Sequence, residues 1–131
     1  MNPSVSSVML RPGSFPVISS DSIFQEALAE MTKFSIGVAC VVSSSKLVGI
    51  FTDGDIRRTL LSFHKPLSAL FVDDALMFSA KHPITIHADA DLKSAVQLME
   101  THKIWDLPVV DDNNILVGLL HLHPAIKSLL N

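Results

Sequence analysis

The residues best suited to chemistry lie in one ten-residue stretch, Gly49-Ile-Phe-Thr-Asp-Gly-Asp-Ile-Arg-Arg58. An apolar run ends at Thr52, and the chain then turns through Gly54 into a predicted helix. The backbone amides at the start of such a helix and the Thr52 hydroxyl would face one edge, which is a natural place for an anion. The spacing therefore predicts a phosphate-binding corner at Thr52.

Two carboxylates in this stretch, Asp53 and Asp55, would repel a phosphate placed directly on them. A carboxylate three residues after Thr52 can instead accept hydrogen bonds from a vicinal diol such as that of a ribose. We therefore expect the phosphate at Thr52 and the sugar hydroxyls at Asp55. Arg57 and Arg58 follow one turn later and could neutralise the phosphate charge.

The same residues also fit an ordinary helix start. Thr52 or Asp53 would cap the helix, and acidic side chains favour the positive end of the helix dipole. Asp55 would then pair with Arg58 or Thr59. Because helix caps are far commoner than ligand sites, the stretch taken alone favours this structural role.

The two halves of the chain are similar in sequence, which indicates an internal repeat. Corresponding residues are Val8-Met9 and Leu76-Met77, Pro16 and Pro83, Ala27 and Ala95, Met31 and Met99, and Leu47-Val48-Gly49 and Leu116-Val117-Gly118. The offset rises from 67 at Pro16 to 69 at Gly49. Both insertions fall in predicted turns, as expected for two copies of one folded unit.

Each copy predicts the same order of elements: strand, helix, strand, strand, helix. The predicted strands are 16–19, 37–43 and 46–52 in the first copy, and 83–86, 106–110 and 115–121 in the second. The closing helices are predicted at 53–63 and 122–130. We expect an α+β fold of two β-α-β-β-α repeats, 1–63 and 76–131, joined by a linker at 64–75. A unit of about 60 residues is marginal alone, so the copies should pack sheet to sheet with pseudo-two-fold symmetry and two equivalent clefts.

His121 and His123 form the second group of candidate residues. Alternate positions on a strand would place both imidazoles on one face, where they could bind zinc. A full ligand set would need residues from elsewhere, because no cysteine or third histidine lies nearby in the sequence. We therefore expect no metal site and favour polar residues of a ligand cleft or a dimer contact.

The composition excludes several other classes of protein. The chain has 131 residues, 48% of them hydrophobic, which excludes intrinsic disorder. The net charge is −3 with scattered charges, so we expect no nucleic-acid partner. The apolar runs 36–42 and 115–122 are far shorter than the roughly 20 residues of a membrane-spanning helix. A single cysteine, Cys40, and the absence of an export signal favour a cytoplasmic location.

The repeats and motifs together resemble a known family. Two copies of strand, helix, hairpin and helix, with Gly-hydrophobic-x-Thr-x-x-Asp after the first hairpin, are similar to a tandem pair of cystathionine-β-synthase (CBS) domains, or Bateman module. More narrowly, the chain resembles the C-terminal CBS pair of the KpsF/GutQ family of D-arabinose 5-phosphate isomerases. The motifs that carry this resemblance are GIFTDGDIRR, HPITIHADADLKSAVQLME, LPVVDD and LVGLLHLH.

The resemblance implies how a ligand is held. In such modules the Thr and Asp of the first motif, here Thr52 and Asp55, hold the phosphate and ribose of a nucleotide. In the second copy His121 stands at the position of Thr52, and Pro124 at that of Asp55, where the isomerases usually keep an aspartate. We therefore place a nucleotide mainly at Thr52 and Asp55. The predicted ligand-binding residues are Thr52, Asp53, Gly54, Asp55, Arg58, His121 and His123.

The resemblance also implies a function. Catalysis in these isomerases belongs to a preceding sugar-isomerase domain, which is absent from this sequence, and no catalytic set emerges from the residues present. The favoured hypothesis is a regulatory module in the route to 3-deoxy-D-manno-octulosonate (Kdo) for lipopolysaccharide. It would sense CMP-Kdo, with an adenine nucleotide as the rival ligand and no cofactor. Its expected partners are the isomerase domain and a second copy in a homodimer. The alternatives are a dimerisation module without ligand and a stand-alone adenine-nucleotide-binding CBS protein.

Overall fold

The computed structural model describes residues 3–131, which form two compact units. The first unit is Gly13–Pro83. The second unit combines residues 3–12 with Ile84–Asn131. Residues 1 and 2, where the first expected repeat begins, lie outside the described range. The predicted mixture of helices and sheets, an α+β fold, is confirmed.

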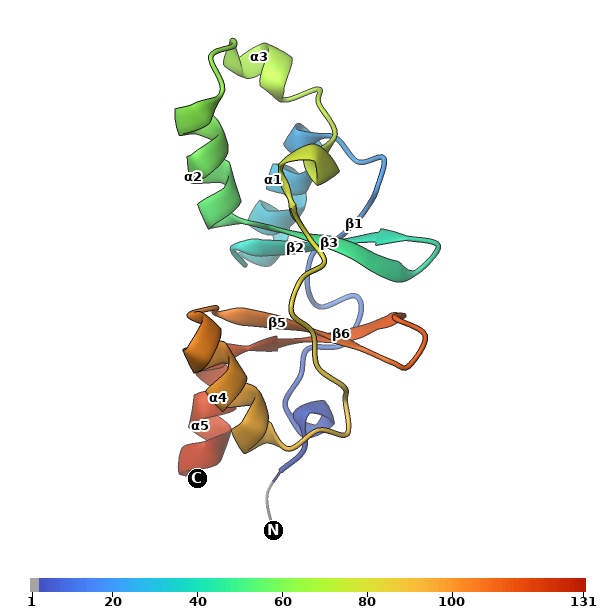
Figure 1. Cartoon of the computed structure of the whole chain (residues 1–131), viewed down its shortest axis with the longest axis vertical. Helices are drawn as coiled ribbons and strands as arrows, with labels where there is room; N and C mark the ends of the chain where they lie inside the picture. Colours follow the sequence, from blue (N-terminus) through green and yellow to red (C-terminus); the bar gives the residue numbers. More distant parts are fainter. Residues whose placement is uncertain (1–2) are drawn as a thin grey trace. The chain divides into compact units, whose positions relative to one another are not determined.

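The first unit contains a four-stranded sheet in the order β1-β2-β3-β4. Its strands are β1 (Val17–Ser19), β2 (Val38–Ser43), β3 (Lys46–Thr52) and β4 (Ala80–Lys81). Its helices are α1 (Phe24–Phe34), α2 (Asp53–Ser62), the short α3 (Leu67–Leu70) and the 3-10 helix η2 (Ala75–Phe78). Strand β1 pairs in parallel with β2, while β2 with β3 and β3 with β4 are antiparallel. Helices α1 and α2 lie on one side of this sheet (Figure 1).

The second unit repeats the hairpin and both helices. Its elements are the 3-10 helix η1 (Val5–Ser7), α4 (Leu92–His102), β5 (Asp106–Val110), β6 (Leu116–His121) and α5 (Leu122–Leu130). The strand predicted at 83–86 is wrong, because only Ile86 forms a single parallel bridge, to Val109. In the first unit the amide of Cys40 donates to the Pro16 carbonyl at 3.0 Å. The corresponding residue of the second unit is Pro108, which has no amide hydrogen to extend this ladder.

The core of the first unit lies between the sheet and its helices. Phe24, Ala27 and Met31 recur on one face of α1 and are buried. The Phe24 ring meets Phe51 and Phe78 edge-on at centroid distances of 5.3 and 5.7 Å, and stacks on Phe71 at 6.1 Å. Aromatic pairs in these arrangements stabilise a fold by more than the burial of their apolar area accounts for.

Residues 64–75 are part of this core rather than the simple linker expected. Leu70 and Ala75 are buried members of the first unit's hydrophobic cluster. The amide of Phe24 donates to the Asp73 carbonyl at 2.8 Å, and that of Ala75 donates to the Ser22 carbonyl at 2.9 Å. Apolar side chains and paired backbone groups therefore fix the segment against α1.

Residues 3–12 play the corresponding part in the second unit. The amide of Val5 donates to the Ala90 carbonyl at 2.9 Å, and Leu10 exchanges two backbone hydrogen bonds with Leu119, of 2.8 and 3.0 Å. Val5 is fully buried in the second unit's cluster. The sequence similarity of Val8-Met9 to Leu76-Met77 thus reflects two segments with the same structural role, one in each unit.

Two corresponding glycines allow these segments to approach the hairpins. A Cβ at Gly118 would lie 2.6 Å from Met9 Sδ and 2.9 Å from the Leu10 carbonyl oxygen. A Cβ at Gly49 would lie 3.0 Å from Leu76 Cδ1 and 3.2 Å from the Ala80 carbonyl oxygen. The close backbone approach, rather than a special backbone conformation, therefore requires glycine at position 118 and favours it at position 49, where the neighbours would have to shift by a few tenths of an ångström.

We expect Gly118→Ala to lower the free energy of unfolding by about 1–3 kcal/mol, because the added methyl group overlaps the backbone of Leu10. Urea denaturation followed by circular dichroism measures this change. The control is Gly54→Ala, whose Cβ would meet the mobile end of Arg58 at 3.2 Å. That variant should be neutral or stabilising by up to about 1 kcal/mol, because alanine favours the helix. Equal destabilisation by both substitutions would contradict the close-approach explanation.

Candidate functional site

The corner between β3 and α2 brings Thr52 and Asp55 into direct contact. The Thr52 amide and hydroxyl both donate to Asp55 Oδ2, at 2.8 and 3.0 Å. The Asp55 amide donates back to Thr52 Oγ1 at 3.2 Å. This reciprocal capping box closes the helix start because a carboxylate at the third helical position reaches the capping residue. Asp55 is buried by this arrangement.

Arg58 completes the group from the next turn of α2. Its Nη2 donates to Asp55 Oδ1 at 2.7 Å, while its side chain is 63% exposed. A Cβ at Gly54 would lie only 3.2 Å from Arg58 Nη1, so the glycine leaves room for the guanidinium. The Arg58 guanidinium ends a flexible side chain that solvent reaches, whereas the Asp55 side chain is only 9% exposed. Arg58 can therefore leave Asp55 and pair with a phosphate.

Asp53 points away from this group, toward Gly37, which the sequence placed at the start of a predicted strand and not in the site. A Cβ at Gly37 would overlap the Asp53 carboxylate, and the Asp53 amide donates to the Gly37 carbonyl at 3.0 Å. Gly37 therefore makes room for this side chain. The repeat contained the signal, since the corresponding residue of the second copy is the bulky Trp105.

The geometry contains the contacts of an ordinary helix start, and it also presents groups for a ligand. One oxygen of Asp55 holds the end of β3, and the other faces an exposed arginine. A sugar hydroxyl could replace the guanidinium at Asp55 Oδ1, because a carboxylate oxygen accepts either donor. Of the predicted residues, Thr52, Gly54, Asp55 and Arg58 lie together, whereas Asp53 faces Gly37.

His121 and His123 do not form the expected pair on a strand. Strand β6 ends at His121, and His123 belongs to the first turn of α5. Alternation along a strand therefore does not place the two rings on one face. His121 Nδ1 instead lies 2.7 Å from Oδ1 of Asp106, a residue that the sequence analysis did not single out. Within residues 3–131, no group of three His, Cys, Asp or Glu side chains is placed to hold a metal ion.

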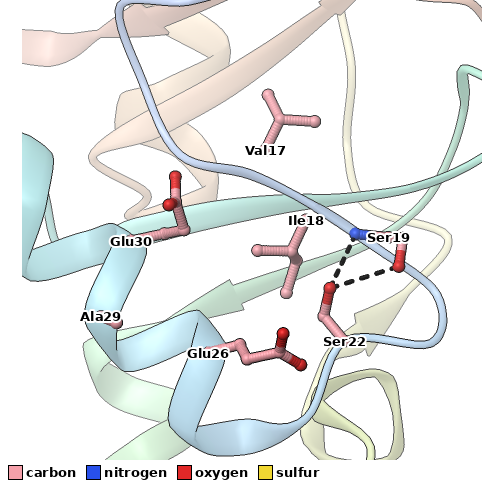
Figure 2. A pocket seen from close by; sticks show the side chains of 7 residues that line it. All are labelled: Val17, Ile18, Ser19, Ser22, Glu26, Ala29 and Glu30. Carbon is pink, nitrogen blue, oxygen red and sulfur yellow. Dashed lines mark hydrogen bonds between the residues drawn. The ribbon is translucent and has the colours of Figure 1, made fainter.

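A depression of about 360 Å³ lies in the first unit between β1 and α1 (Figure 2), and none of the predicted site residues lines it. Its lining residues are Val17, Ile18, Ser19, Ser22, Glu26, Ala29 and Glu30. Ser22 Oγ accepts from the Ser19 amide at 3.0 Å, and Glu26 Oε1 accepts from the Ile23 amide at 2.9 Å. Two glutamates and no basic side chain line this depression, so it does not suit a phosphate.

None of the helices in the described part of the chain combines the length and the apolar character needed to cross a membrane.

Comparison with known proteins gives a family match over most of the chain. The family model described as CBS domain matches twice, over residues 5–62 and 72–123. A probable arabinose 5-phosphate isomerase of Haemophilus influenzae is 38% identical over 105 residues, which cover 80% of this chain and 30% of that protein. The arabinose 5-phosphate isomerase KdsD of Francisella tularensis is 27% identical over 123 residues, covering 94% and 36%. The chain spans about a third of the length of the curated relatives it matches.

The fold also matches solved structures. The crystal structure of CBSX2 in complex with AMP, a CBS-pair protein of Arabidopsis thaliana, superposes with a TM-score of 0.84 at 21% identity. The match covers 97% of this chain and 96% of that one.

Proposed function

Because the chain belongs to the CBS-domain family, as a tandem pair of these domains, we propose that it is a regulatory module that binds a nucleotide or nucleotide sugar at the Thr52–Asp55 corner. The observation that carries this proposal is the buried Asp55 carboxylate, held by Thr52 on one side and by the exposed Arg58 on the other. The sugar hydroxyls would replace Arg58 at Asp55, and the released guanidinium would pair with the phosphate. The Thr52 hydroxyl lies at the same corner and would also bind the phosphate.

The parent protein in this proposal is an arabinose 5-phosphate isomerase. Two relatives with that printed activity support it, and the chain covers only 30% and 36% of their lengths. The module would act on the sugar-isomerase domain of the same protein in the route to Kdo and lipopolysaccharide. CMP-Kdo, an end product of that route, is the ligand we favour. Regulation requires that the ligand bind two arrangements of the protein with different affinities.

Two other functions compete with this one. A stand-alone adenine-nucleotide-binding CBS protein is supported by the fold match to a CBS pair in complex with AMP. A dimerisation module without ligand is supported by the helix-start contacts, which satisfy Asp55 with protein groups alone. A cytoplasmic location is part of all three proposals, and the buried Cys40, the single cysteine of the chain, agrees with a reducing compartment.

Isothermal titration of the purified chain with CMP-Kdo, CMP, AMP and ATP separates these functions. Binding of CMP-Kdo that is tighter than that of CMP and AMP supports the isomerase module. Tighter binding of AMP or ATP supports the stand-alone alternative. No binding below about millimolar dissociation constants overturns nucleotide sensing and leaves the dimerisation module.

The exposed face of α2 supports the proposed homodimer. The residues that this helix buries are polar, Asp55 and Thr59, whereas Leu60 and Leu61 are 52% and 76% exposed. The corresponding position of Leu61 in the second unit is Leu130, which is 81% exposed. An apolar position left uncovered in both repeats fits a self-complementary interface between two copies.

We expect Leu61→Glu to weaken dimerisation at least tenfold, because a carboxylate would be buried without a partner. Sedimentation velocity over a series of protein concentrations measures the dissociation constant. Thr32→Glu, on an exposed position of α1, is the control and should leave it unchanged. A wild-type chain that stays monomeric at every concentration would contradict the homodimer.

A further inference from the structure

The second unit carries a carboxylate–imidazole pair that the proposed function does not use. His121 is the last residue of β6, Asp106 is the first residue of β5, and the two are directly opposite in the hairpin register. His121 Nδ1 and Asp106 Oδ1 are 2.7 Å apart. The His121 side chain is 36% exposed and that of Asp106 is 12% exposed, so the imidazole reaches solvent while the carboxylate is largely covered.

This pair occupies the same register as the Thr52 corner of the first unit. There the residue opposite Thr52 is Val38, an apolar residue, and the neighbouring carboxylate comes from Asp55 in the following helix. Pro124 takes the helix position in the second unit, and no side chain caps α5 at His121. The facing strand supplies a carboxylate instead. Both units therefore place a carboxylate beside the residue that ends the hairpin, by two different routes.

The contact determines what the His121 ring can offer to a ligand. An ionised carboxylate only accepts hydrogen bonds, so Nδ1 of His121 carries the hydrogen and donates it to Asp106. In a neutral imidazole the other nitrogen, Nε2, then presents a lone pair. A lone pair at this position accepts a hydrogen bond from a hydroxyl group, which is the role we assign to Asp55 in the first unit.

We propose that Asp106 is a positioning residue that holds His121 as the acceptor for a sugar hydroxyl of a second bound nucleotide or nucleotide sugar. His121 contacts the ligand, and Asp106 acts through His121. This inference rests on the proposed function and extends it to the second unit. Pro124 stands where the first unit has the helix carboxylate, and His121 would take over the binding of the hydroxyl group.

The test begins with the tautomer of His121, because a stability measurement alone does not show which ring nitrogen carries the hydrogen. Nitrogen-15 NMR of the histidine-labelled wild-type chain should show the hydrogen on Nδ1 of His121. In Asp106→Asn the side chain is neutral and can either accept from or donate to Nδ1, so the fraction of His121 with the hydrogen on Nε2 should rise. The control is Asp112→Asn, which removes an equally charged carboxylate from the same unit, 3.4 Å from His87 Nδ1.

Binding at the second unit is measured in a Thr52→Ala background, which weakens the first unit's site. Titrations with CMP-Kdo and with AMP should leave residual binding that Asp106→Asn and His121→Gln each weaken about tenfold. Asp112→Asn should leave the residual binding unchanged. The single tryptophan of the chain, Trp105, precedes Asp106 and is 70% exposed, so its fluorescence gives a second signal.

The outcomes separate this inference from the proposed function. A wild-type His121 with its hydrogen on Nε2 overturns the positioning role, as does unchanged residual binding in Asp106→Asn. Complete loss of binding in Thr52→Ala overturns a second site and leaves the first intact. A wild-type chain that binds neither CMP-Kdo nor AMP overturns both proposals.

Discussion

Asp55→Ala is expected to weaken nucleotide binding at the first unit by at least a hundredfold. The substitution removes the acceptor of two sugar hydroxyls, and each hydrogen bond to a charged group contributes about 1.5–3 kcal/mol. It also removes the anchor of the Thr52 amide and of Arg58, so both donors lose their partner. Isothermal titration with CMP-Kdo and AMP measures the affinity.

Two further variants separate binding from stability. Asp55→Asn keeps the size of the side chain and an oxygen that can accept from the Thr52 amide, so the helix start should persist while binding still falls. Asp21→Ala removes the same charge from an exposed turn of the same unit and should change the affinity less than twofold. Unchanged affinity in Asp55→Asn and Asp55→Ala, with both variants folded, would place the nucleotide elsewhere.

Phe24→Ala is expected to cause the largest loss of stability, about 3–5 kcal/mol, because a large buried side chain leaves a cavity. The ring is in contact with three other aromatic rings, two of which, Phe71 and Phe78, come from the segment after α2. The melting temperature should fall by roughly 10–20 °C. Differential scanning calorimetry and urea denaturation measure the two quantities.

Phe34→Ala, at the end of the same helix, is the matched control. Phe34 is half-buried, and Lys33 Nζ lies 5.4 Å from the centroid of its ring. The loss in the free energy of unfolding should therefore stay below about 1.5 kcal/mol. Hydrogen exchange adds a local test. In Phe24→Ala, protection should fall in α1 and in residues 70–78 together, and a loss confined to α1 would contradict the packing of this segment into the first unit's core.

The hairpins and main helices were predictable because their signals are local. Apolar runs with a polar turn between them specify β2 with β3, and β5 with β6, while apolar spacing specifies α1 and α4. The Thr52–Asp55–Arg58 group was predictable for the same reason. Residues three positions apart on a helix are neighbours whatever the rest of the chain does.

The contact between Asp106 and His121 depended on a feature that spacing does not reveal. Counted evenly from the turn, Asp106 would face Leu120. A register shift next to Val109 moves its partner by one residue, to His121. Because a shift of one residue exchanges the two faces of a strand, the pairing follows from the bulge and not from the residue types.

By itself the sequence determined the repeat, the two hairpins with their main helices, and the Thr52 corner, because each depends on residues close together along the chain. Only the tertiary structure decided that residues 3–12 join the second unit, that residues 67–81 join the first, and that Asp106 holds His121. These contacts join distant residues, and they form where burial of apolar groups and strand register offset the entropy of closing long loops.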